Sequence, residues 1–153
     1  MDTYKKFLKR SVKVDPSQYQ QAKTLLEACG VPCIIARGEA EALAVALCRA
    51  GLCDGVASND LDCVCYGAPL FIRNLGNDEK REVIQIKYDD VLEQLHFSQE
   101  QFIDLCILLG CDYLETVKGV GPKSAFKLIQ EYKSIDEIVE KNTKFCDKVK
   151  ETF

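Results

Sequence analysis

Five acidic side chains are spaced in a way that could do chemistry: Glu39, Glu41, Asp60, Asp62 and Asp112. Carboxylates that converge without cations repel one another and raise each other's pKa values. Divalent cations reverse this effect, and an oxygen-only set of ligands suits Mg²⁺ or Mn²⁺. Two such ions about 4 Å apart can activate a water and stabilise the leaving oxygen of a phosphodiester. If the five acids converge, they indicate phosphodiester hydrolysis.

The spacing of these acids also leaves a purely structural explanation open. A glutamate in the first turn of a helix is favoured by the helix dipole alone, and an aspartate after a strand is common in loops. If the chain stays extended at Asp60 and Asp62, both carboxylates point the same way. Glu39 and Glu41 diverge at a helix start, so they share a metal only if one approaches from the loop side.

A second group of candidates lies in the glycine-rich segment 119–123, whose sequence is Gly-Val-Gly-Pro-Lys. It separates two helical patterns, residues 102–109 and 124–132. A tight glycine turn exposes backbone amides, proline suits the first turn of a helix, and a helix N-terminus attracts anions. The predicted DNA-binding residues here are Gly119, Gly121, Lys123 and Lys127. A plain connection between two helices is the alternative.

Strands and helices must position these residues. Helices are predicted over 17–29 and 39–50, short strands over 32–36, 55–58 and 70–74, and a half-exposed strand over 82–88. Ser98 and Ser134 each begin a pattern typical of a helix N-terminus. Strands interleaved with helices, followed by helices alone, predict an α/β core over 1–95 and a helical region over 96–153. Short apolar strands are typical of a mostly parallel sheet, flanked by helices.

The predicted strands place the acids at one edge of that sheet. Glu39 follows strand 32–36, and Asp60 follows strand 55–58. Sites in open α/β sheets form at the carboxyl ends of the strands. Glu39 and Asp60 are therefore expected to lie near each other.

Composition bounds the class of protein. The chain has 153 residues, and its hydrophobic content of 47% is that of a globular protein. Its net charge of −4 argues against indiscriminate binding of nucleic acid. Basic side chains gather in residues 1–13 and 118–133, and Lys6, Lys9 and Arg10 in the first of these segments are DNA-binding candidates. The apolar runs are too short to cross a bilayer, and no signal-peptide core follows the first basic residues. Nine cysteines then favour free buried thiols in the cytoplasm or nucleus.

Four ordered motifs together resemble the flap endonuclease family. Residues 38–42 (GEAEA) are similar to its Glu-Ala-Glu-Ala segment, and 58–62 (SNDLD) to its Asp-x-Asp segment. Residues 105–113 (LCILLGCDY) are similar to the stretch that carries its last metal ligand, and 119–123 to its helix-hairpin-helix. The resemblance runs from about Tyr4 to Lys141.

This resemblance implies a PIN-like sheet, a C-terminal helix-hairpin-helix module and a two-metal nuclease of replication and repair. Its reaction would be structure-specific 5′-flap endonuclease or 5′-3′ exonuclease cleavage of DNA at single-strand/double-strand junctions. Glu39 and Glu41 would serve one Mg²⁺ or Mn²⁺ ion, and Asp60, Asp62 and Asp112 the other. The hairpin would grip duplex DNA and hold a K⁺ ion on its backbone carbonyls. Lys6, Lys9 and Arg10 would correspond to the end of the helical arch that handles the flap.

The chain also departs from the family pattern. The family's amino-terminal segment, with further metal-binding aspartates, and its carboxy-terminal sliding-clamp peptide have no counterpart here. We therefore expect the second half of a catalytic core, which needs the missing half as a partner for activity. A non-catalytic duplex-binding module is the alternative function. A junction resolvase or 5′ exonuclease of the same superfamily shares the motifs.

Overall fold

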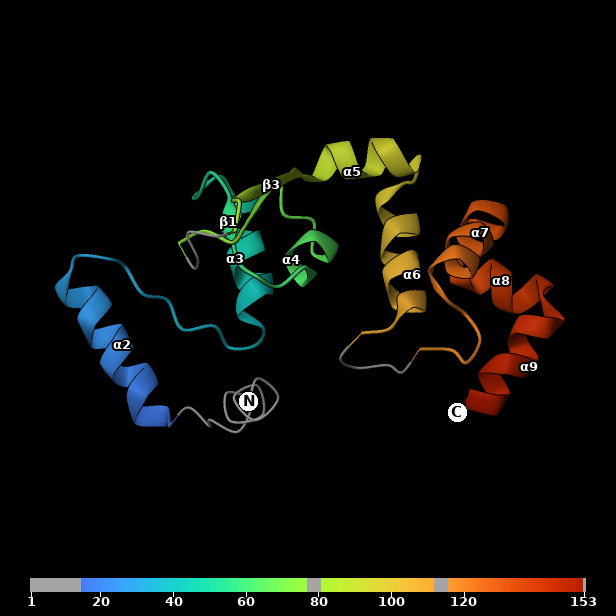
Figure 1. The fold of residues 1–153 in the computed structure, drawn as a ribbon, viewed down its shortest axis with the longest axis horizontal. Helices are drawn as coiled ribbons and strands as arrows, with labels where there is room; N and C mark the ends of the chain where they lie inside the picture. Colours follow the sequence, from blue (N-terminus) through green and yellow to red (C-terminus); the bar gives the residue numbers. More distant parts are fainter. Residues whose placement is uncertain (1–14, 77–80, 112–115, 153) are drawn as a thin grey trace. The chain divides into compact units, whose positions relative to one another are not determined.

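A computed structural model describes residues 15–76, 81–111 and 116–152 of the chain, with side chains described as far as Asp147. Internal contacts divide the chain into two units, Met1–Arg37 and Gly38–Phe153. The helices of both and two of the strands are labelled in Figure 1. The boundary expected between residues 95 and 96 stays a prediction.

The described part of the first unit contains helix α2, Pro16–Ala28. The Asp15 carboxylate accepts a hydrogen bond from the Ser17 N–H at 2.8 Å, and Pro16 occupies the first turn, where a missing N–H costs nothing. At the other end, Gly30 adopts φ +78°, as glycine does after a helix. The predicted helix over 17–29 is thus confirmed to within one residue at each end.

The strand expected over 32–36 is wrong, because residues 31–36 have no regular secondary structure. The side chains of Ile34 and Ile35 are 67% and 76% exposed, so this apolar segment is not packed as a buried strand would be. An apolar run of strand length forms a strand only when a neighbouring strand supplies backbone hydrogen bonds. Within the described ranges, no strand pairs with this segment.

The second unit begins with α/β structure. Helix α3 (Ala40–Arg49) is followed by strand β1 (Val56–Ala57), helix α4 (Asp62–Cys65), strands β2 (Leu70–Arg73) and β3 (Ile84–Lys87), and helix α5 (Tyr88–Leu95). Within the sheet, of order β1-β2-β3, β1 pairs with β2 in parallel and β2 with β3 antiparallel. This part of the chain confirms the α/β class, and its core is centred on the fully buried Phe71 and Cys63.

Four helices complete the described part of the second unit: α6 (Gln99–Leu109), α7 (Pro122–Tyr132), α8 (Ile135–Lys141) and α9 (Thr143–Thr152). The Ser98 hydroxyl caps α6 by accepting from the Gln101 N–H at 3.3 Å, as the capping pattern predicts. A second core, centred on Ile129 and Ile138, holds the helices together. Leu95 packs against both cores and connects them.

All nine cysteines are free thiols, as expected, but only Cys48 and Cys63 are buried. Across the described ranges, no helix has both the length and the apolar character needed to cross a membrane.

Candidate functional site

Glu39 and Glu41 lie at the start of α3. Glu39 is the residue just before the helix, with the extended backbone of an N-cap (φ −62°, ψ 127°), and Glu41 is in the first turn. Negative charge is favoured at this end of a helix. Glu39 is exposed and Glu41 half-buried, so both carboxylates are accessible.

Asp60 and Asp62 lie in a turn that follows β1. The Asp62 N–H donates to the Asp60 Oδ1 at 3.0 Å, and the Asp60 N–H donates to the Ser58 Oγ at 3.1 Å. α4 begins at Asp62. The extended arrangement considered for Asp60 and Asp62 is therefore wrong, because local side-chain-to-backbone bonds favour a turn over extended chain.

Ser58 connects the two pairs of acids. Its hydroxyl donates to the Glu41 Oε1 at 3.5 Å and accepts from the Asp60 N–H. The β1–β2 pairing holds Ser58 in place, because its own N–H donates to the Ile72 carbonyl at 3.1 Å. Sequence reasoning missed Ser58, although a serine two residues before an aspartate is a signal for this kind of turn.

An open hollow of about 600 Å³ lies over the turn, lined by Ser58, Asn59, Asp60, Leu61 and Arg73. Arg73 ends β2, whose parallel pairing with β1 brings the carboxyl ends of both strands to one edge. It places a cation beside Asp60, as a phosphate-binding site would need. Sequence reasoning missed Arg73 too, because only the strand register identifies it.

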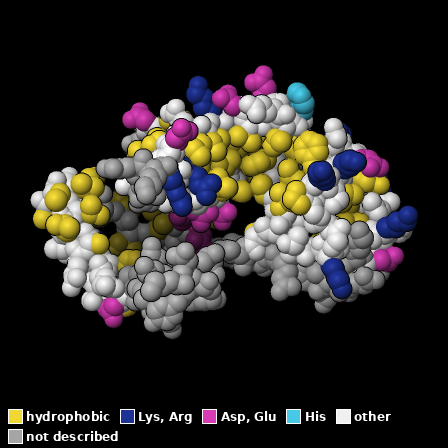
Figure 2. Space-filling view, in the orientation of Figure 1, with side chains coloured by type: hydrophobic (Ala, Val, Ile, Leu, Met, Phe, Trp, Pro, Cys, Tyr) yellow, Lys and Arg dark blue, Asp and Glu magenta, His cyan; other side chains and the backbone are white. Residues whose placement is uncertain are grey.

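The pKa of the Tyr66 hydroxyl, at the end of α4, is affected by both pairs of acids. Partial desolvation raises the pKa of its hydroxyl, and the negative charges of Glu39, Asp62 and Glu41 raise it further. Acids from the starts of α3 and α4 therefore act on one hydroxyl. Figure 2 shows acidic side chains gathered over the part of the second unit that holds these helices.

The donor set has the chemistry that a hard divalent cation requires, because carboxylates and a hydroxyl supply only oxygen. The ligand set is only partly formed in the described part of the chain, where no three His, Cys, Asp or Glu side chains come close enough to hold a metal ion. Asp112, the fifth predicted ligand, lies outside the described residues. Glu41 and Asp60, joined through Ser58, are the members that the structure brings together.

The predicted hairpin lies between α6 and α7. The Val120 N–H donates to the Val117 carbonyl at 2.9 Å, and both valines are buried, which anchors the turn to the second core. Gly119 adopts φ +75° within it. Gly121 precedes α7, and its N–H donates to the Ser124 Oγ at 2.9 Å.

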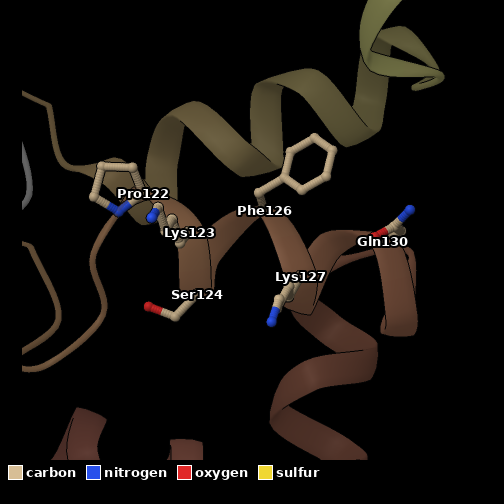
Figure 3. Close-up of a pocket in the computed structure, with 6 residues that line it drawn as sticks. All are labelled: Pro122, Lys123, Ser124, Phe126, Lys127 and Gln130. Atoms are coloured by element: carbon tan, nitrogen blue, oxygen red, sulfur yellow. The ribbon is translucent and has the colours of Figure 1, made fainter.

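An open hollow of about 660 Å³ lies along α7, lined by Pro122, Lys123, Ser124, Phe126, Lys127 and Gln130. Figure 3 shows the polar ends of Lys123, Ser124 and Lys127 projecting from α7, with Phe126 directed away from them. The Phe126 ring packs on Phe97, with centroids 5.0 Å apart. Both lysines are exposed, whereas Lys6, Lys9 and Arg10 lie outside the described residues.

The part of the chain that holds the predicted acids matches a known protein family. Residues 30–112 match the XPG I-region, which is more than half of the chain. The chain belongs to the XPG I-region family. It is 50% identical to flap endonuclease 1 of Debaryomyces hansenii over 94% of its length, and 46% identical to that of Entamoeba histolytica over 89%. It spans 38% and 37% of those two proteins.

Comparison with solved structures agrees with the assignment of this chain to the XPG I-region family. Flap endonuclease-1 from Methanococcus jannaschii has a TM-score of 0.78 and 32% identity, covering 96% of this chain and 47% of that one. The catalytic core of Rad2 in complex with DNA substrate has a TM-score of 0.79 and 28% identity, covering 99% and 48%. The chain therefore has the α/β fold of these nucleases.

Proposed function

We propose that this protein is a metal-dependent, structure-specific 5′ nuclease that hydrolyses DNA phosphodiesters at flaps and junctions. The observation that carries the proposal is the Glu41–Ser58–Asp60 hydrogen-bonded link at the carboxyl end of β1, beside Arg73. Membership of the XPG I-region family supports it, since the relatives are flap endonucleases. The chain covers less than half of those relatives, so this activity is proposed for the whole protein.

The acids would divide the work of binding cations. Glu39 and Glu41 would face one Mg²⁺ or Mn²⁺ ion, while Asp60, Asp62 and Asp112 would face another. Bound divalent cations supply a polarised water and neutralise charge on the phosphate. Ser58 would hold the Glu41 carboxylate in position, and Arg73 would contact a phosphate oxygen from the same hollow.

The α7 hollow would hold duplex DNA by its backbone. Pro122 has no N–H, so the first free donor of α7 is the Lys123 N–H, which no acceptor in the described part of the chain reaches. Lys123 and Lys127 add charges on the exposed surface of the same helix. Such contacts reach phosphates and carry no sequence information.

A cleavage assay tests the proposal. The chain is incubated with a labelled 5′-flap duplex and Mg²⁺ or Mn²⁺, with and without the amino-terminal segment that flap endonucleases carry. We expect cuts near the junction when that segment is present, and none with an Asp60→Asn variant. If the folded chain gives no cleavage in either mixture, the proposal fails.

A second candidate function is a non-catalytic module that binds duplex DNA through the hairpin. It is favoured by the absence, within the described residues, of three ligand side chains around one point, while α7 presents its lysines. This candidate predicts duplex binding that Asp60→Ala does not change, and no cleavage under any condition. DNA binding that requires the acids and a divalent cation would exclude it.

Finer parts of the proposal concern cofactors and partners. Mg²⁺ or Mn²⁺ is proposed at the acids and K⁺ at the hairpin carbonyls, in keeping with oxygen-only donors. Action in the nucleus is proposed because the matched relatives include eukaryotic flap endonucleases. An amino-terminal half acting as a partner is proposed from the family resemblance.

A further inference from the structure

Two cysteines from different helices line one hollow beside the proposed nuclease site, and the proposed nuclease chemistry does not use their thiols. Cys65 lies at the end of α4 and Cys106 in the middle of α6, far apart in the sequence. Both are half-buried, and both line a hollow of about 260 Å³ together with Asp62, Tyr66 and Cys111. The packing of α4 against α6 brings the two thiols together.

The shared hollow lets the two thiols influence each other. Hydrogen bonding with Cys106 lowers the pKa of Cys65 against the opposing effects of burial and the Asp62 charge, and hydrogen bonding with Cys65, together with burial, raises the pKa of Cys106. Cys65 thus becomes a thiolate more readily than an ordinary cysteine, while Cys106 keeps its proton. A thiolate is the attacking species in disulfide exchange, and a neighbouring thiol completes the bond.

We propose that Cys65 and Cys106 form a reversible disulfide when the protein meets a small-molecule disulfide such as oxidised glutathione. The inference does not depend on the proposed nuclease function. Cys65 attacks one glutathione sulfur, the glutathione S–S bond breaks, and one glutathione leaves as its thiol. Cys106 then attacks the Cys65 sulfur and releases the second glutathione. The protein loses two hydrogens, the two released thiols gain them, and the Cys65–Cys106 bond remains.

The other cysteines provide the contrast. The Cys146 Sγ donates to the Val139 carbonyl at 2.8 Å, and the Cys33 Sγ lies 3.7 Å from the Val31 carbonyl, so their recorded partners are backbone oxygens. Both are half-buried, as Cys65 and Cys106 are. Burial alone therefore does not distinguish the pair. The position of both thiols in one hollow, between two packed helices, does.

Peptide mapping tests the inference on the full chain. The reduced protein is treated with oxidised glutathione, its remaining thiols are alkylated, and the digest is analysed by mass spectrometry. We expect a cross-linked peptide pair containing Cys65 and Cys106, lost on reduction with dithiothreitol. A dominant Cys65–Cys111 link, a lasting glutathione adduct on Cys65, or unmodified thiols would each overturn the proposal.

Matched serine variants sharpen the result. Cys106→Ser should accumulate glutathione on Cys65, because the resolving thiol is gone, whereas Cys146→Ser should form the cross-link as the wild type does. Circular dichroism checks that each variant is folded. If a variant does not fold, peptide mapping of the wild-type chain still tests the proposal. If Cys106→Ser collects no more glutathione at Cys65 than wild type does, Cys106 is not the resolving thiol.

Discussion

At the scale of single residues, Asp60 serves both the local turn and the proposed chemistry. Its Oδ1 accepts from the Asp62 N–H, which makes the turn that starts α4. An asparagine can accept the same bond but carries no charge. Exchange of Asp60 for asparagine therefore separates the structural role of this side chain from its electrostatic role.

For Asp60→Asn we expect Mn²⁺ affinity to fall about tenfold or more, the loss typical of disturbed metal sites. The free energy of unfolding should change by less than about 1 kcal/mol, because the turn is kept. Electron paramagnetic resonance of free Mn²⁺ and a urea titration measure the two quantities. Asp54→Asn removes an exposed charge outside the hollow. An equal loss of affinity in that control would contradict a site at Asp60.

For Lys123→Ala we expect weaker binding to every duplex sequence and a salt dependence whose slope falls by roughly one. The physical reason is the loss of one phosphate contact and its counterion release. Fluorescence anisotropy over a range of salt concentrations measures it. Lys87→Ala removes the same charge from the exposed end of β3 and should leave the slope unchanged. A loss confined to one DNA sequence would argue against backbone recognition.

At the scale of elements, the end of α6 depends on one glycine. Gly110 adopts φ +95°, where side chains are disfavoured, and a Cβ there would lie 2.6 Å from the Thr116 Oγ1. Rotation of the threonine relieves the contact but leaves the backbone strain. α6 must end here so that the chain can turn towards the hairpin before α7.

We expect Gly110→Ala to destabilise the second unit by about 1–3 kcal/mol, the cost of a residue held in a disfavoured backbone region. Urea unfolding followed by circular dichroism measures this change. Gly38→Ala is the matched control, because Gly38 has no positive φ and nothing within 4 Å of its Cβ position. Equal losses in the two variants would show that the α6 terminus is not strained.

At the scale of the whole molecule, two hydrophobic cores support the two proposed functional regions. The core around Phe71 holds β1 and β2 and thus the acids, while the core around Ile129 holds α6, α7 and α8 and thus the hairpin. Leu95 packs against both. Damage to the Ile129 core should therefore reduce duplex binding by reducing the folded fraction.

For Ile129→Ala we expect a loss of about 2–5 kcal/mol in the free energy of unfolding, because the side chain is fully buried and leaves a cavity. Val139→Ala, at a side chain that is 49% exposed, should cost less than about 1 kcal/mol. Urea unfolding compares the two. A small loss at Ile129 would mean that this core is loosely packed.

The sequence by itself determined what depends on neighbouring residues. Asp15 and Ser98 cap their helices through bonds spanning two or three positions, so α2 and α6 were predictable from local patterns. The start of α7 at Pro122 was also predictable, because proline is well tolerated in the first turn of a helix and disrupts a helix interior. The acids could be proposed as a group because their order along the chain matched a known family.

Only the tertiary structure decided what depends on contacts between distant segments. Residues 32–36 are apolar enough for a strand, yet they find no pairing partner in the described chain. Ser58 meets Glu41 because β1 packs beside α3, and Cys65 meets Cys106 because α4 packs against α6. Composition and residue spacing do not predict these contacts, because burial and strand pairing join segments that are far apart in the sequence.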